Sequence, residues 1–190
     1  MIKKIVLMLL LMGYVHAESL PLEGRKFGVE FNIPRLLTYS DSWQSASGTF
    51  SYFDHEDSVE VAFPWLVSNQ KSSGYYGSDR HFDVINMDIH YRKFLGDKMD
   101  GFYLSGFGRV SHLNGLLDDE DRYKKTVKFG LGVGLGYRLF PISQRYYWGI
   151  GLIVGRYVSG ENEIYQDVDF SLEDSPIIVD IEFLKFGYAF

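Results

Sequence analysis

The sequence predicts an all-β fold, an eight-stranded antiparallel transmembrane β-barrel, from three observations. Segments in which large apolar residues alternate with small or polar ones recur along the chain, and this period of two is that of a β-strand. The clearest segment, residues 127–137, alternates large apolar side chains with glycine and is about as long as a strand that tilts across a bilayer, roughly 9–11 residues. Aromatic residues make up 17% of the chain and glycine contributes 20 residues, a mixture typical of membrane barrels with aromatic girdles.

The N-terminus has the pattern of a secretory signal peptide. Lys3 and Lys4 precede an apolar run at residues 5–12, and Val15 and Ala17 have the spacing of a cleavage site. We expect residues 1–17 to be removed after Ala17, which leaves 18–190 as one barrel domain. An uncleaved anchor helix is the alternative, but the apolar run is short for a membrane span. The residue after Ala17 is not cysteine, so a lipoprotein is excluded.

The charge and cysteine content exclude several functions. Removal of the signal peptide leaves 17 basic residues against 25 acidic ones. A chain with this acidic balance is a poor candidate for nucleic-acid binding, which uses a basic face. The chain has no cysteine, so it forms no disulfide and has no thiolate chemistry.

Alternation and turn residues divide the chain into strands joined by long and short connections in turn. The eight expected strands cover residues 24–33, 47–54, 58–67, 81–94, 101–110, 127–137, 146–157 and 177–190. The long connections cover 34–46, 68–80, 111–125 and 158–176, and the short turns cover 55–57, 96–100 and 141–144. Alternating long external loops and short periplasmic turns are typical of outer-membrane barrels.

Three strands need a closer reading. In the second, which is the least regular, Phe50 and Tyr52 define the expected apolar face. In the third, Pro64 cannot donate to a sheet ladder, so we expect a bulge or the end of the strand there. In the last, the alternation changes phase near Phe183 and Leu184, which a β-bulge would explain.

The end of the chain resembles the outer-membrane protein family, whose members finish in an alternating aromatic motif with a C-terminal Phe used for barrel insertion. The matching residues are Leu184, Phe186, Tyr188 and Phe190. By strand count the chain resembles the eight-stranded OmpA/OmpX-like barrels. The segments GFYLSGFGRV, KFGLGVGLGYRLF and YYWGIGLIVGRYVSG are similar to Gly- and aromatic-rich outer-membrane barrels of uncharacterised function. The resemblance implies the outer membrane of a Gram-negative bacterium and contact with the barrel assembly machinery through the terminal motif.

In such a barrel the apolar face meets lipid and the other face lines the interior. We expect glycines to make room for Tyr103 and Phe107, and residues of both charge signs to pair inside. The charged and polar residues on that face are Glu30, Glu60, Asp88, His90, Arg92, Arg109, Lys128, Arg138, Asp180 and Glu182. Eight strands leave an interior just wide enough for side chains to fill. A wide, porin-like pore does not follow; a narrow aqueous path or a binding site inside is the alternative.

The sequence identifies no catalytic, cofactor-binding or metal-binding residues. The histidines His55, His81, His90 and His112 lack the spacing of a metal site. The segment 111–115, SHLNG, superficially resembles the site of lipid A-modifying enzymes but lacks the ordered His-x-Ser-Asn pattern of the deacylases. The acidic run 118–121 lacks the spacing of an EF-hand loop and suits a solvated loop or one bridged by divalent ions to lipopolysaccharide.

We therefore expect a non-enzymatic, structural or surface-interaction barrel in the outer membrane. Its partners would be outer-membrane lipids and lipopolysaccharide, with the external loops meeting outside partners. One alternative is a lipid A-modifying enzyme centred on Ser111, His112 or His90. Another is a soluble periplasmic barrel with its faces inverted, so that the aromatic face lines an apolar ligand cavity. The oligomeric state does not follow from the sequence.

Overall fold

The computed structural model describes residues 24–37, 43–73, 79–96, 99–117, 122–140, 145–159 and 177–190. The expected signal peptide at 1–17 with its cleavage site, the acidic run at 118–121 and the turn at 141–144 lie outside these residues. Most of the loop expected at 158–176 lies outside them as well.

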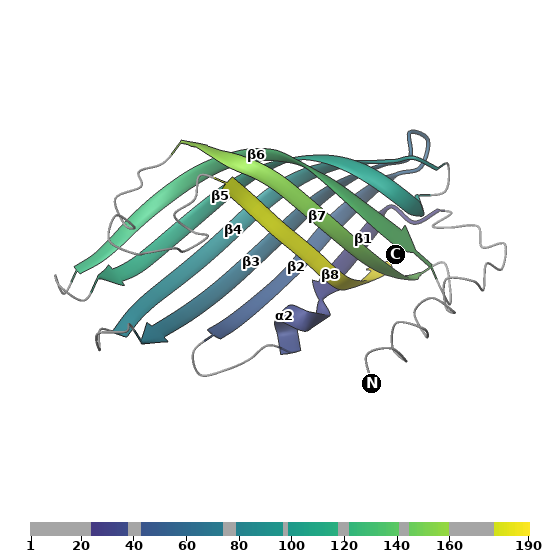
Figure 1. Cartoon of the computed structure of the whole chain (residues 1–190). Coiled ribbons are helices and arrows are strands. Elements are labelled where there is room, and N and C mark those ends of the chain that lie inside the picture. The colour runs from purple at the N-terminus through teal and green to yellow at the C-terminus, as the bar shows by residue number, and fades with distance from the viewer. Residues whose placement is uncertain are drawn as a thin grey trace.

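The chain forms a closed antiparallel barrel of eight strands in sequence order, with β8 pairing back onto β1 (Figure 1). The elements are β1 (Phe27–Asn32), α2 (Ile33–Leu37), β2 (Trp43–Asp54), β3 (Val59–Ser73), β4 (Asp79–Phe94), β5 (Gly101–Leu117), β6 (Arg122–Leu139), β7 (Tyr146–Ser159) and β8 (Ile177–Ala189). Within the described ranges, no helix has the length and apolar character needed to span a membrane. We call the end of the barrel that holds Phe27 and Phe190 the terminal end, and the opposite end the far end.

The period-two pattern places large apolar side chains outside and charged ones inside, as predicted. In β6, for example, Leu131 and Val133 are 60% and 68% exposed, whereas the inward-facing Lys128 and Arg138 are each 1% exposed. The phase predicted for β2 is confirmed by the exposed rings of Phe50 and Tyr52. The inverted arrangement of the soluble alternative is therefore not the one that the described strands adopt.

The strands extend further toward the far end than predicted. The expected loop 111–125 is mostly strand, because the pairing of β5 with β6 continues as far as Leu117 opposite Arg122. The expected loop 68–80 is likewise replaced in large part by β3 and β4, which pair as far as Ser73 opposite Asp79. The expected loop 34–46 contains α2 and the start of β2. Ladder hydrogen bonds need no apolar side chains, so the strands continue where the apolar alternation fades.

The expectation of a bulge or strand end at Pro64 is wrong. The register of β3 with β4 is the same at Ala62 opposite His90 as at Trp65 opposite Met87, and β3 runs on to Ser73. The pairs of Phe63 and Pro64 with β4 are missing from an otherwise regular ladder. A proline lacks the N–H donor for that ladder, so the strand tolerates it by a local loss of pairing.

The expected bulge near Phe183 and Leu184 is confirmed. The register of β7 with β8 shifts by one residue between Gly149 and Gly151. Leu184 has a φ of 52°, in the left-handed region that a leucine seldom adopts. The inward face of β8 consequently changes phase, so that Glu182 precedes the bulge and Lys185 follows it, and both side chains are buried.

Glycines on the inner wall make room for large rings, as predicted. The Tyr103 ring lies where a Cβ atom on Gly136 would be, and the Phe107 ring lies against Gly132 and Gly155. The Tyr147 ring covers Gly187 in the same way. An inward-facing aromatic side chain therefore depends on a glycine on a neighbouring strand.

A methyl group added at Gly136 tests this dependence. We expect Gly136→Ala to lower the free energy of unfolding by about 1–3 kcal/mol, because the new Cβ overpacks against the Tyr103 ring. Gly106→Ala is the matched control, because no atom lies within 4 Å of its added Cβ. Equilibrium unfolding of the two refolded variants in urea measures the difference. Equal stability of both would show that the ring does not need the glycine.

Candidate functional site: the charged interior

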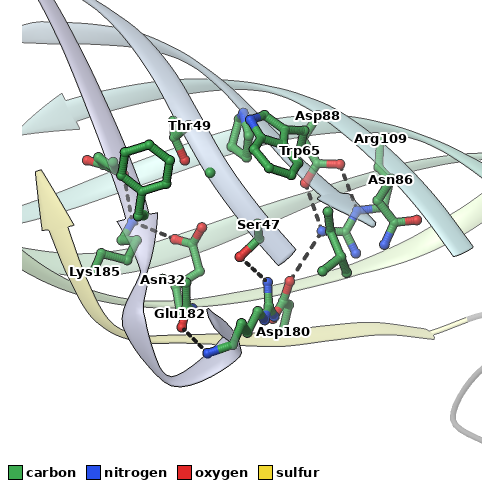
Figure 2. A pocket seen from close by; sticks show the side chains of 16 residues that line it. Asn32, Ser47, Thr49, Trp65, Asn86, Asp88, Arg109, Asp180, Glu182 and Lys185 are labelled. Carbon is green, nitrogen blue, oxygen red and sulfur yellow. Dashed lines mark hydrogen bonds and ion pairs between the residues drawn. The ribbon is translucent and has the colours of Figure 1, made fainter. Parts of the chain in front are cut away.

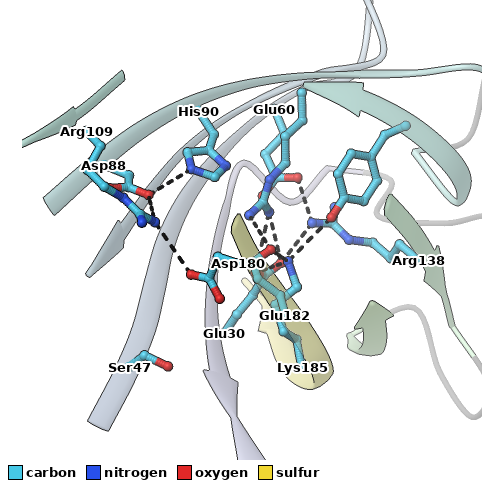
Figure 3. A network of polar contacts seen from close by, with 12 residues as sticks. Glu30, Ser47, Glu60, Asp88, His90, Arg109, Arg138, Asp180, Glu182 and Lys185 are labelled. Atoms are coloured by element: carbon cyan, nitrogen blue, oxygen red, sulfur yellow. Dashed lines mark hydrogen bonds and ion pairs between the residues drawn. The ribbon is translucent and has the colours of Figure 1, made fainter. Parts of the chain in front are cut away.

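The largest group of buried charges lies toward the terminal end, and we call it the terminal-end cluster (Figure 3). It consists of Glu30, Glu60, Arg92, Arg138, Glu182 and Lys185. Arg138 Nη2 lies 2.6 Å from Glu60 Oε2 and 2.9 Å from Glu30 Oε1. Arg92 Nη1 lies 3.0 Å from Glu60 Oε1, and Lys185 Nζ lies 2.7 Å from Glu182 Oε2. Three acids face three bases, so the cluster carries no net charge.

Aromatic rings close the barrel beyond this cluster. The guanidinium of Arg138 lies over the rings of Tyr147, Phe94 and Phe53, at 4.4, 4.9 and 5.4 Å from their centroids. These rings pack with Met99 and Tyr103 into one buried core. Cation–π contact with a desolvated guanidinium is favourable by about 2 kcal/mol or more. The terminal end of the interior is thus filled by side chains.

A second group of polar side chains lies midway along the interior, and we call it the mid-barrel cluster. It consists of Arg35, Asp88, His90, Arg109 and Asp180. Arg109 donates two hydrogen bonds to Asp88, from Nε to Oδ1 at 2.8 Å and from Nη2 to Oδ2 at 2.7 Å. His90 Nε2 lies 3.2 Å from Asp88 Oδ2, and Asp180 accepts from both Arg109, at 3.5 Å, and Arg35. Two Asp–Arg pairs are therefore linked through Asp180, as Figure 2 shows in part.

Two cavities adjoin the mid-barrel cluster. The smaller, of about 20 Å³, is shown in Figure 2 and reaches from Glu30 and Lys185 to Arg109. The larger, of about 210 Å³, extends from Arg109 toward the far end. The residues that line both are Arg35, Leu66, Asn86, Arg109 and Asp180. The interior is thus filled at the terminal end. It contains room for a small molecule on the far-end side of the mid-barrel cluster.

The inward face predicted from the sequence is the one observed. Nine of the ten predicted residues are buried, and Asp180 is partly buried. Two members of the clusters were missed. Lys185 lies three residues from Glu182, and the two can face inward together only because the bulge changes the phase of β8 between them. Arg35 lies in a segment that the sequence predicts to be a loop, although the Asn–x–Pro pattern before it is a helix-start signal.

The structure does not bring the candidate catalytic residues together. Ser111 is buried inside β5 and shares a hydrogen bond of 2.9 Å with the hydroxyl of Tyr157. His112 follows it on the strand and therefore points to the opposite face. His90 pairs with Asp88 instead, and it lies four residues along β4 from the residue opposite Ser111. No Ser–His pair forms at this segment.

The other histidines and the comparisons add no site. His55 lies in the turn after β2 and shares a hydrogen bond with the carbonyl oxygen of Arg25, and His81 belongs to β4. Among the described residues no three His, Asp or Glu side chains are arranged to hold a metal ion. No protein-family model, curated protein or solved structure matches the chain.

Removal of one charge tests whether the terminal-end cluster stabilises the fold. We expect Arg92→Met to lower the free energy of unfolding by about 3–5 kcal/mol, because it leaves three buried carboxylates facing two bases and removes one of the two guanidinium partners of Glu60. Lys93→Met, on the exposed side of the same strand, should change it by less than about 1 kcal/mol. Adding Glu60→Gln to Arg92→Met should restore part of the loss. Urea unfolding of the refolded proteins measures all three, and an undestabilised Arg92→Met would contradict the role of the cluster.

Proposed function

We propose that the chain is an integral outer-membrane β-barrel with a structural or surface-interaction role and no enzymatic activity. The observation that carries this proposal is the distribution of exposed apolar side chains, which face outward on every strand of the barrel. Examples are Phe31, Trp65, Ile89, Leu104 and Leu131. Soluble monomers seldom expose a contiguous apolar patch of more than a few hundred Å². A lipid bilayer is the surrounding that suits such a surface.

A band of aromatic rings at the terminal end supports the same proposal. Exposed or half-exposed rings follow one another from β7 across β8 and β1 to β2, with centroids 5.1–6.2 Å apart. The rings in order are Trp148, Phe186, Tyr146, Tyr188, Phe190, Phe27 and Phe50. Such girdles anchor membrane barrels at the level of the lipid headgroups. Leu184, Phe186, Tyr188 and Phe190 would also be the contact with the barrel assembly machinery.

The filled terminal end of the lumen favours a structural or surface role over transport of solutes through the barrel. The terminal-end cluster and its aromatic core occupy the lumen at one end. Function would then reside at the outer surface, which meets membrane lipids, and at the far end, where the longer connections would meet lipopolysaccharide or outside partners. The proposed orientation places the terminal end in the periplasm.

Membrane separation tests the proposal. We expect the mature protein in the outer-membrane fraction of a Gram-negative host, with a gel mobility that changes on boiling, because a folded barrel resists unfolding in detergent. A band in the soluble periplasm without a heat shift would overturn it.

A single substitution distinguishes a lipid-facing surface from a water-facing one within the same experiment. Leu131→Arg places a charge in the middle of the outward band and should destabilise the barrel in lipid by about 2–4 kcal/mol. Leu131→Ala is the control for loss of the leucine side chain alone. In a water-exposed barrel Leu131→Arg would leave the free energy of unfolding nearly unchanged. Equal free energies of unfolding for the two variants in liposomes would therefore contradict the proposal.

The lipid A-modifying alternative has a direct test. Because Ser111 and His112 point to opposite faces, we expect the mass spectrum of lipid A to be the same with and without the protein. A new lipid A species that disappears in the Ser111→Ala variant would establish an enzyme. Tyr157→Phe is a useful companion variant, because it removes the hydroxyl that Ser111 contacts but leaves the serine in place.

A further inference from the structure

An open groove crosses the outer surface of the barrel between two rows of outward-facing side chains, and we call it the outer groove. Its volume is about 700 Å³, and every strand from β2 to β7 contributes to its lining. One row lies on β3 to β6, where successive residues stand opposite one another, and consists of Trp65, Met87, Val110 and Phe129. The other row, two residues away along each strand, consists of Phe50, Phe63, Ile89, Gly108 and Leu131. The lining is therefore almost entirely apolar.

A glycine forms the floor of the outer groove on β5. Gly108 follows the inward-facing Phe107, so it faces outward, where it has no side chain. A Cβ atom added there would lie 3.7 Å from both Ile89 Cγ2 and Leu131 Cδ2, which is ordinary van der Waals contact. A larger side chain at this position would therefore occupy the groove without a clash at its Cβ atom.

The outer groove rises toward the far end of the barrel. Followed around the barrel, the row that contains Trp65 starts at Trp148 on β7 and returns to the same strand at Ser159. Rows advance along the strands in this way because the strands of a closed barrel are tilted. From β2 to β7 the groove crosses five inter-strand spacings, about 24 Å, and one leaflet is about 15 Å deep, half of a hydrocarbon core of about 30 Å. The inclined groove is thus long enough for one acyl chain of one leaflet.

An arginine lies at the far-end mouth of the outer groove. Arg156 is exposed and faces outward on β7, two residues from Val158, which lines the groove. Its neighbours on the outer surface include Val154, Val158 and Ile177, which are 45%, 63% and 53% exposed. Within the described ranges its guanidinium has no hydrogen-bond or ion-pair partner. A cation among lipid-facing apolar side chains is costly unless an anion accompanies it.

The two parts of this surface indicate the chemistry of one ligand. A guanidinium forms paired hydrogen bonds with a phosphate group, and the apolar groove beside it suits a hydrocarbon chain. In the proposed orientation the far end faces the outside of the cell. The phosphate-bearing lipid at that level is then the lipid A part of lipopolysaccharide.

We propose that the outer groove and Arg156 form a binding site for one molecule of lipid A. A phosphate group of the lipid lies at Arg156, and one acyl chain passes Phe129 and Gly108 along the groove toward Phe50. The remaining acyl chains stay in the surrounding bilayer. This inference rests on the proposed outer-membrane location, and it gives the lipopolysaccharide partner of that proposal a defined site.

Native mass spectrometry of the refolded barrel tests the phosphate contact. The protein in detergent micelles is titrated with bisphosphorylated lipid A or with lipid A from which both phosphates have been removed, and the fraction that carries one bound lipid is measured. We expect Arg156→Gln to weaken binding of the phosphorylated lipid at least fivefold. Removal of the phosphates should weaken binding to the unchanged protein by a similar factor. It should have little further effect on Arg156→Gln, because the contact is already lost.

A glycine substitution tests the groove separately. Gly108→Leu should weaken binding of both forms of lipid A at least fivefold, because the leucine side chain occupies the groove. Gly106→Leu is the matched control, because Gly106 is the next outward-facing glycine of β5 but does not line the groove. Lys93→Gln removes an exposed charge near the terminal end and should leave binding unchanged. Each variant is first checked for the heat-dependent gel shift, so that a misfolded protein is not read as a lost site.

Three results would overturn the site. An equal loss on phosphate removal in the unchanged protein and in Arg156→Gln would show that another group holds the phosphate. Equal binding by Gly108→Leu and Gly106→Leu would show that the lipid only surrounds the barrel. Retention of phosphatidylglycerol in preference to lipid A would show that the ligand is a phospholipid. All three leave a folded, heat-modifiable barrel in lipid, whereas failure of the proposed function would be seen as a protein that does not enter the bilayer.

Discussion

The structure depends on mutual neutralisation of charges in a closed interior. The terminal-end cluster takes its members from five strands: β1, β3, β4, β6 and β8. Removing a single ion from water costs several kcal/mol even after relaxation, so each charge is tolerable only when its partners are in place. Partners from so many strands meet only when the barrel closes with every strand in register. We therefore infer that the charges disfavour barrels that are open or have strands out of register. On this hypothesis they contribute to the specificity of the fold and do not make it more stable than an apolar core would.

The bulge in β8 belongs to the same constraint. Glu182 and Lys185 are three residues apart, and in a regular strand such residues point to opposite faces. The left-handed conformation of Leu184 and the one-residue register shift turn both side chains inward, where their charged atoms lie 2.7 Å apart. A leucine with positive φ costs roughly 1–3 kcal/mol, and the structure retains it only where the surroundings require it. Here the requirement is that the cluster has its third acid and its third base.

The sequence predicted the faces of the barrel better than the extent of its strands. Alternation determines the side of each residue, so inward placement of Glu60 and Arg138 follows from the pattern alone. The predicted strand ends were wrong where the apolar alternation fades into segments such as SHLNGLL. There the ladder is formed by backbone hydrogen bonds to a partner strand, and the sequence of a single segment does not reveal that partner. The pairing of Arg35 with Asp180 joins residues 145 positions apart, and no local pattern specifies it.

The two halves of the interior differ because β1 is short. Where β1 completes the wall, the lumen holds the terminal-end cluster and aromatic rings packed against glycines, beside a cavity of about 20 Å³. Where α2 follows β1, the helix packs against β2 and β8 without a backbone ladder, Arg35 contacts Ser47 and Asp180, and the larger cavity lies at this level. The Asn-Ile-Pro-Arg sequence at residues 32–35 thus separates a half of the barrel in which β1 completes the ladder from a half in which α2 packs against β2 and β8.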